Sequence, residues 1–391
     1  MFGFGTKNPD FSYVAILDIA SGSVGTAIYE FAVASSNAKP KAIFQNRILL
    51  TAQATADAEQ PSLRAVKEAL LTSLLELNSR GITELQSIAP GAAISDVSVS
   101  VAAPWAHIVP REISYADDEL FTVSEALIAE LKASAEEQAE DVLNESNITQ
   151  NQQLRVINRQ VTSVTANGYP LRNGGVGVET PELTISMSSC FVREDILKVI
   201  DEVVEKIFPH TDVRYTSFVQ AFQKHIRTVQ PKNPNVFLVD ITGEATEVAL
   251  IAEHKLKMVT FAPNGIHTTA RFIAETEEIP VNEALTYLKN LEEIILENSA
   301  KTITQAAIAY QHTLERLLGH ITITETIPVN VYLLSNEPMG SFFTQTLTET
   351  LKNSDHTTHT VRKIEKKLLP VMPEEGFQDV RLAMIAHFFH N

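Results

Sequence analysis

The sequence predicts an α/β protein with two lobes, because one strand–turn–strand unit occurs twice and helical periodicity follows each copy. The first copy reads VAILDIASGSVGTAIY at residues 14–29, and the second reads VFLVDITGEATEVALI at residues 236–251. Each is an apolar strand that ends in Asp-Ile, then a turn of small residues, then a second apolar strand. Two units with the same order of elements and the same aspartate predict a pseudo-symmetric pair of lobes with a cleft between them.

The segments that follow each hairpin extend the parallel between the two halves. Residues 42–50 and 257–261 are candidates for a third strand in the first and second copy, respectively. Residues 61–78 carry an apolar stripe at 3.6-residue spacing, which predicts a helix. Residues 264–276 and 282–318 also predict helices, the second of them broken once.

The stretch between the two copies predicts an inserted subdomain. Residues 97–103 alternate like a strand, and residues 123–143 predict a long acidic helix. Residues 154–164 predict another strand, and the Gly-rich loop 167–177 leads to a strand at residues 183–187. The order is therefore strand, helix, strand, loop and strand.

Composition excludes several classes of function. The 391 residues carry a formal net charge of -17, and no dense basic cluster is present, which argues against nucleic acid as a partner. The single cysteine, Cys190, excludes a disulfide framework and a cysteine zinc site within the chain. No apolar run approaches the ~20 residues that a membrane-spanning helix needs.

The two hairpin turns carry a resemblance to a known family. DIASGSV at residues 18–24 and DITGEAT at residues 240–246 resemble the two phosphate motifs of the actin-like superfamily, which includes actin, Hsp70 and sugar kinases. Within it, the chain looks like the bacterial FtsA and PilM branch, and MFGFG at residues 1–5 resembles the start of many PilM-type proteins. The resemblance implies an α/β, actin-like two-lobed (ribonuclease H-like) fold with an inserted FtsA-type 1C subdomain.

This resemblance implies a division of the chain into five segments. They are 1–95 as the first part of lobe I (1A), 96–190 as the inserted 1C subdomain, 191–234 as the return to lobe I, 235–345 as lobe II (2A and 2B), and 346–391 as the final strand and helix that complete lobe I. The apolar stretch 380–389 then predicts the last core helix of the first lobe.

The resemblance also implies where Mg-ATP would bind. The implied cofactor-binding residues are Asp18, Gly22, Ser23, Asp240, Gly243 and Ser335. Asp18 and Asp240 would act as the metal residues, because hard carboxylate oxygens orient Mg²⁺ or its waters. The alternative is that each aspartate accepts backbone N–H bonds within its own turn. Glu247 is a candidate base or, alternatively, a solvated residue at a strand edge.

Three turns depart from the phosphate-binding pattern. Glycine lets the backbone N–H groups approach an anion closely, but Ala20 and Glu244 stand where glycines are expected. In the third motif, the strand at residues 331–334 runs into SNEPMG at residues 335–340, where Pro338 fixes φ and removes an N–H. These departures predict a degenerate site that requires no cofactor and has no catalytic residues.

The favoured function is a scaffold at the cytoplasmic face of the inner membrane, with weak or no ATP binding. The resemblance implies an FtsA-like role in cell division or a PilM-like role in type IV pilus assembly. The partner would be a tubulin-like division protein or a peptide of a pilus inner-membrane protein, and the chain could also form a homo-oligomer or filament. Membrane association would be peripheral, through the partner, and no transmembrane segment is expected.

The alternative function belongs to another class. An active Mg-ATP-dependent ATPase or kinase of the superfamily would use Asp18 and Asp240 for the metal and the backbone of Gly22 and Gly243 for phosphate. Residual ATP binding or slow ATP hydrolysis therefore stays open at this point, although the loss of glycines favours a protein that is not an enzyme.

Overall fold

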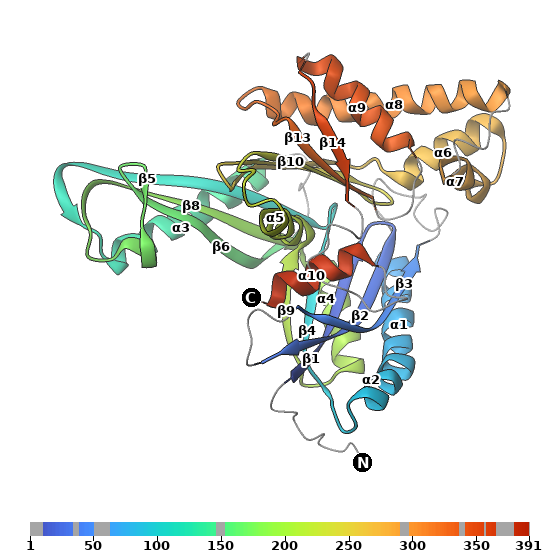
Figure 1. Ribbon diagram of the computed structural model, residues 1–391, viewed down its shortest axis with the longest axis horizontal. Coiled ribbons are helices and arrows are strands. Elements are labelled where there is room, and N and C mark those ends of the chain that lie inside the picture. The colour runs from blue at the N-terminus through green and yellow to red at the C-terminus, as the bar shows by residue number, and fades with distance from the viewer. Residues whose placement is uncertain are drawn as a thin grey trace.

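A computed structural model of the chain describes residues 11–33, 39–50, 63–145, 153–289, 297–335, 341–355, 357–364 and 379–390. These residues form two α/β lobes, and a long, narrow sheet projects sideways from the region where the lobes meet (Figure 1). The predicted motif at residues 1–5 lies outside the described residues.

The first lobe is built on a five-stranded sheet of order β3-β2-β1-β4-β9. Its strands are β1 Phe11–Ala20, β2 Ser23–Ala32, β3 Lys41–Leu49, β4 Ile94–Val101 and β9 Asp212–Ser217. Strand β1 is antiparallel to β2 and parallel to β4. Eight consecutive residues of β1 are buried, as expected for a strand with both faces covered.

Helices pack against this sheet in two groups. Helix α1 packs on α4, and α10 packs on α5 and on β1. The helices of this lobe are α1 Leu63–Glu76, the π-helical turn η1 Leu77–Gly81, α2 Ile82–Ile88, α4 Glu194–Ile207, α5 Phe218–Val229 and α10 Val380–His390. Helix α5 begins at a capping box, in which Ser217 Oγ accepts the backbone N–H of Gln220.

The second lobe repeats the plan with a five-stranded sheet of order β12-β11-β10-β13-β14. Its strands are β10 Val236–Ile241, β11 Thr246–Ala252, β12 Lys255–Ala262, β13 Asn330–Ser335 and β14 Thr360–Lys363. Its helices are α6 Ile266–Glu277, α7 Val281–Lys289, α8 Glu297–Thr322 and α9 Phe342–Asp355. Strand β10 is antiparallel to β11 and parallel to β13, as β1 is to β2 and β4.

The two hairpins also share one register. Asp18 pairs with Gly25, and Asp240 pairs with Glu247, so each aspartate faces the residue seven positions further along the chain. The predicted duplication is therefore confirmed at the level of individual residue pairs.

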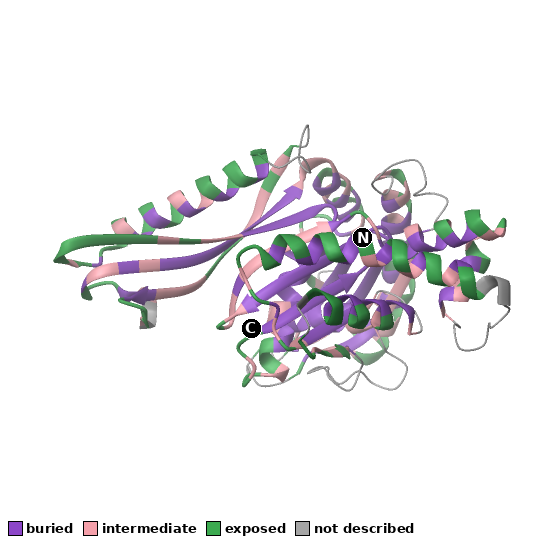
Figure 2. Cartoon of the chain, turned by 90° about the horizontal axis from the view of Figure 1, so that it is seen from above, coloured by how far each residue is buried: buried purple, intermediate pink, exposed green. Residues whose placement is uncertain are grey.

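The insertion is a separate sheet of order β5-β8-β6-β7 with one helix on it. It comprises β5 Ala106–Thr122, α3 Glu125–Glu145, β6 Leu154–Ala166, β7 Tyr169–Pro170, the 3₁₀ turn η2 Arg172–Gly175 and β8 Glu179–Arg193. Figure 2 shows buried strands filling the body of the molecule, whereas the outer part of β5 in the insertion is mostly exposed.

The start of the insertion differs from the expected boundary. Residues 97–103, predicted to open the insertion, instead lie in β4 and its end, in the sheet of the first lobe, and the insertion begins with β5. The 17 residues of β5 escaped prediction because most of its outer part is exposed on both faces and shows no alternation.

The prediction for residues 346–391 is wrong in one part. The strand in this segment, β14, pairs in parallel with β13 and therefore completes the second lobe, not the first. Helix α9 leads into it and packs on α8, which is the crossover that a parallel pair requires. Helix α10 packs on α5, β1 and β2 of the first lobe.

The described residues form two large apolar clusters. The first is centred on β1, β2 and α10 and extends to the second sheet through residues such as Leu238, Ala249 and Tyr332, so it spans both lobes. The second is centred on β10, β11 and α8 and lies within the second lobe. Among the described residues, no helix combines the length and apolar character that crossing a membrane would require.

Candidate functional site

The two aspartates predicted as metal residues come together between the lobes. Asp18 lies near the end of β1 and is fully buried, and Asp240 lies near the end of β10 with 2% of its surface exposed. The duplicated register gives them equivalent places in the two sheets. Two buried carboxylates need compensating charge, because desolvation of an unpaired ion costs several kcal/mol.

Arg381 of helix α10 supplies that charge by bridging both aspartates. Its Nε donates to Asp18 Oδ2 at 2.8 Å, and one terminal nitrogen donates to Asp240 Oδ1 at 2.6 Å. The guanidinium carbon lies 3.4 Å from the centre of the Phe218 ring, in a cation–π contact. The Arg381 side chain is only 3% exposed, so water screens these ion pairs little.

Arg47 of β3 forms a second bridge from the other side. It donates to Asp18 Oδ2 at 2.9 Å, to Ser23 Oγ at 2.7 Å and to Asp379 Oδ2 at 2.6 Å. Gly25 makes room for it, since a Cβ at Gly25 would lie 2.6 Å from a terminal nitrogen of Arg47. Asp379 also accepts the backbone N–H of Leu382, so the same network fixes the start of α10.

The charges of this network shift several pKa values. Burial raises the pKa of Asp240, while the attraction of Arg381 opposes this rise. Burial would lower the pKa of Arg381, but Asp18 and Asp240 raise it above its ordinary value. Burial and the nearby Asp240 raise the pKa of Glu247 to about 8, so Glu247 is protonated at neutral pH. With 4% of its surface exposed, Glu247 is not the solvated edge residue that we considered.

The two turns that resemble phosphate motifs touch each other directly. A Cβ on Gly22 would lie 2.6 Å from Gly243 Cα, so the backbones of the two turns are in contact. Ser21 Oγ and Thr242 Oγ1 share a hydrogen bond of 2.6 Å. The backbone N–H of Glu244 donates to Ser21 Oγ at 2.8 Å. This N–H group therefore has a protein partner in place of an external anion.

Glu244 turns away from the contact between the turns and toward helix α6. Arg271 donates to both of its carboxylate oxygens, at 2.9 and 2.6 Å, and Thr268 donates to one of them at 3.0 Å. The N–H groups of Ile266 and His267, at the start of α6, donate to the carbonyls of the second turn. Glu244 is therefore paired, and the carbonyl groups of its turn accept the first N–H groups of α6.

Two predicted residues remain, Ser23 and Ser335. Ser23 accepts a hydrogen bond from Arg47, as above. Ser335 ends β13 and pairs with Ile241 in the second sheet. The rest of the third motif, residues 336–340, lies outside the described residues.

Sequence reasoning missed the two arginines and Asp379. One signal was available for Arg381: it is the only charged residue in the apolar stretch 380–389. An arginine on a buried helix needs an acidic partner, because lone buried charges are rare. The aspartates that end two apolar strands were the candidates, but no short-range pattern connects them to residue 381.

In chemical terms, this centre is a set of buried ion pairs between the lobes. Both aspartates accept hydrogen bonds from guanidinium groups, and each turn fills the space in front of the other. A magnesium triphosphate seated there would have to displace Arg381 and separate Gly22 from Gly243. The residues present therefore do not fit Mg-ATP in this arrangement.

A hollow with a volume of about 600 Å³ lies between the insertion and the first lobe. It is lined by Gln160, Val161, Thr162, Arg214, Gln220, Gln223, Lys224, Arg227, Thr228, His254, Phe388 and Phe389. Arg214 stacks over Phe389 and Lys224 over Phe388, with 5.3 Å from cation to ring centre in both cases. The lining is therefore basic and aromatic; we refer to this hollow as the basic groove.

Comparison with known proteins supports the fold. No protein-family model matches the sequence, and no curated protein matches it. Among solved structures, a chain of the PilM-PilN type IV pilus biogenesis complex is similar, with a TM-score of 0.60, 13% identity, and coverage of 96% of this chain and 94% of that one. Ethanolamine utilization protein EutJ from Carboxydothermus hydrogenoformans has a TM-score of 0.48 and 11% identity, covering 96% and 89% of the two chains. The chain therefore has the predicted actin-like, two-lobed α/β fold.

Proposed function

We propose that this protein is a non-catalytic, actin-like scaffold whose lobes are held together by side chains in the place where the superfamily holds a nucleotide. The bridge from Arg381 to Asp18 and Asp240 carries this proposal. A guanidinium group there supplies the positive charge that Mg²⁺ would otherwise bring to the two carboxylates. The contact between Gly22 and Gly243 supports it, because it leaves no approach for phosphate oxygens.

The scaffold would recruit an extended peptide of an inner-membrane protein. Along β6, the described residues hydrogen-bond β8 on one side, but β7 pairs on the other side only with Thr165 and Ala166. The open edge of β6 supplies Val161 and its neighbours to the basic groove. An exposed sheet edge can accept an added strand, and Arg214, Lys224 and Arg227 favour an acidic segment.

A role in type IV pilus assembly is the version of this proposal that the comparison favours, since a chain of the PilM-PilN complex shares the fold over nearly its whole length. In this role the protein would be cytoplasmic and would reach the inner membrane through its partner. A role in cell division beside a tubulin-like protein is the competing version. A comparison of peptide binding distinguishes the two.

Mg-ATP is expected to leave the stability of the protein unchanged. A ligand at a hundredfold excess over its Kd stabilises the native state by about 2.7 kcal/mol. Because Arg381 already occupies the carboxylates, we expect millimolar Mg-ATP to move the melting temperature by less than about 1 °C. A clear upward shift that is lost in Asp240→Asn, with phosphate release above background, would establish the ATPase instead.

Binding of a pilus peptide is expected to depend on the basic groove. Calorimetry would compare cytoplasmic peptides of pilus inner-membrane proteins with the C-terminal peptide of a tubulin-like division protein. Arg227→Glu, at an exposed position in the groove, should weaken the binding of the pilus peptide by roughly fivefold to tenfold, because the new carboxylate repels an acidic peptide. Lys198→Glu, at an exposed position of α4 outside the groove, is the control for charge reversal and should have no effect on binding. Preference for the tubulin-like peptide would move the assignment to cell division.

A further inference from the structure

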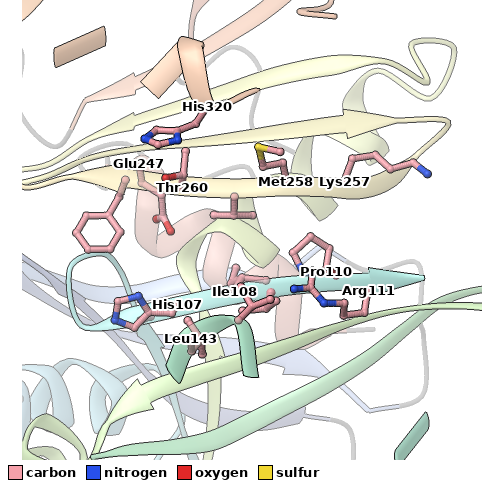
Figure 3. A pocket seen from close by; sticks show the side chains of 15 residues that line it. His107, Ile108, Pro110, Arg111, Leu143, Glu247, Lys257, Met258, Thr260 and His320 are labelled. Carbon is pink, nitrogen blue, oxygen red and sulfur yellow. Dashed lines mark hydrogen bonds between the residues drawn. The ribbon is translucent and has the colours of Figure 1, made fainter. Parts of the chain in front are cut away.

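A pocket that the proposed scaffold function does not use lies between the insertion and the second lobe. Its volume is about 440 Å³, in the range of small-molecule sites. Strand β5 and helix α3 line one side, and β11, β12 and α8 line the other (Figure 3). The lining residues are Ala106, His107, Ile108, Val109, Pro110, Arg111, Val142, Leu143, Glu247, Lys257, Met258, Val259, Thr260, Phe261 and His320.

Most of this lining is apolar, but its inner end carries an unpaired polar atom. His107 is 8% exposed, and its Nε2 has no hydrogen-bond partner among the residues that the structure describes. Figure 3 shows His107 on β5, across the space from Glu247 and His320. A buried polar atom without a partner costs about 1–3 kcal/mol, which a bound polar group would recover.

Two of the groups at the inner end, His107 and Glu247, are uncharged at neutral pH. Burial and the nearby Arg193 lower the pKa of His107 to about 4, so its imidazole is neutral. Glu247 is protonated, as described above. Both groups can therefore exchange hydrogen bonds with a neutral hydroxyl or carbonyl, and they neither require nor repel a charge there.

The other end of the pocket carries a cation without a counter-ion. Arg111 donates to the backbone carbonyls of Pro110 and Gln138, and within the described part of the chain it forms no ion pair. Partial burial lowers its pKa. Lys257, the other cation of the lining, already lies 3.6 Å from Glu112.

The separation of the two ends sets the length of a ligand. Arg111 follows His107 by four residues along β5, which at ~3.4 Å per residue places their Cα atoms about 14 Å apart. Between them lie Ile108, Leu143 and Met258, which offer apolar contacts but no charge.

We propose that this pocket binds an elongated apolar carboxylate with a neutral polar group at its far end. The carboxylate pairs with Arg111, the apolar chain packs between β5 and β12, and the far polar group hydrogen-bonds His107 Nε2. Such a molecule contacts the insertion and the second lobe together, so its binding stabilises their relative placement.

Titration of the full-length protein with 10-hydroxydecanoate tests the proposal. We expect one molecule per chain by calorimetry, with tighter binding than decanoate and much tighter binding than 1-decanol. Trp105, the one tryptophan of the chain, lies two residues before His107, so its emission should change on saturation. Arg111→Gln should weaken the binding of both carboxylates by about tenfold or more and leave the binding of 1-decanol unaffected.

A second variant separates loss of the pocket from loss of the fold. Val142 is 42% exposed on α3 at the pocket, so Val142→Trp fills space without disturbing a core and should abolish binding of all three probes. Arg155→Gln, on the same insertion but paired with Asp201 at a solvent-exposed site, is the matched control for charge. Absence of binding to the wild-type protein, or binding that neither Arg111→Gln nor Val142→Trp weakens, would overturn the proposal.

Discussion

Replacement of Arg381 by methionine is expected to lower the free energy of unfolding by about 3–5 kcal/mol, the usual cost of removing one partner from a buried ion pair. Methionine retains much of the apolar stem, so the loss reports mainly on charge. Asp240 would lose its only charged hydrogen-bond donor among the described residues, and Asp18 would keep Arg47 alone. Urea denaturation followed by circular dichroism measures the change.

Two further variants make this result specific. Arg64→Met removes an exposed i,i+4 pair with Glu68 and should change stability by no more than about 0.5 kcal/mol. The double variant Asp240→Asn with Arg381→Met should recover part of the loss, because the stranded carboxylate is removed as well. If Arg381→Met costs less than about 1 kcal/mol, the arginine does not hold the lobes together and the scaffold proposal loses its main support.

Alanine at Gly22 is expected to destabilise the protein by about 1–3 kcal/mol or more, as overpacking of a close contact does. The added methyl group would lie 2.6 Å from Gly243 Cα and 2.9 Å from Gly243 N. Since these are backbone atoms, the two turns must separate. Gly243→Ala meets the same contact from the other side. The loss of stability in the double variant should therefore be smaller than the sum of the two single losses. The melting temperature and the urea midpoint give both values.

Gly319→Ala is the matched control for this experiment. Gly319 lies in helix α8, and an added Cβ would have no heavy atom within 4 Å. Alanine there should stabilise the helix by about 0.5–1 kcal/mol. Glycine-to-alanine changes would thus act in opposite directions at the two places. An unchanged stability in both Gly22→Ala and Gly243→Ala would show that the turns do not touch.

The elements with strong local patterns could be predicted from the sequence. The apolar strands before Asp18 and Asp240 and the helical stripe of α1 follow from alternation, run length and 3.6-residue spacing. Strand β5 could not, because half of it faces solvent on both sides. The placement of β14 could not either, since four residues carry no sign of which sheet they join.

The candidate site shows a different limit of sequence reasoning. Asp18, Asp240, Gly22 and Gly243 were identified from their motifs, and all four lie where the lobes meet. What a motif cannot specify is the partner of each residue. A glycine that would admit a phosphate also admits another glycine, and an aspartate that would hold a metal also holds an arginine. Only the fold reveals that Arg381 stands between them.

The bridge from Asp18 to Arg381 joins residues 363 positions apart. During synthesis, the strand that carries Asp18 leaves the ribosome long before the helix that neutralises it. Until that helix arrives, the nascent first lobe holds a carboxylate in an apolar sheet with Arg47 as its nearest cation. The bridge therefore forms only after residue 381 has been synthesised, and contacts between residues so far apart in the chain form slowly during folding.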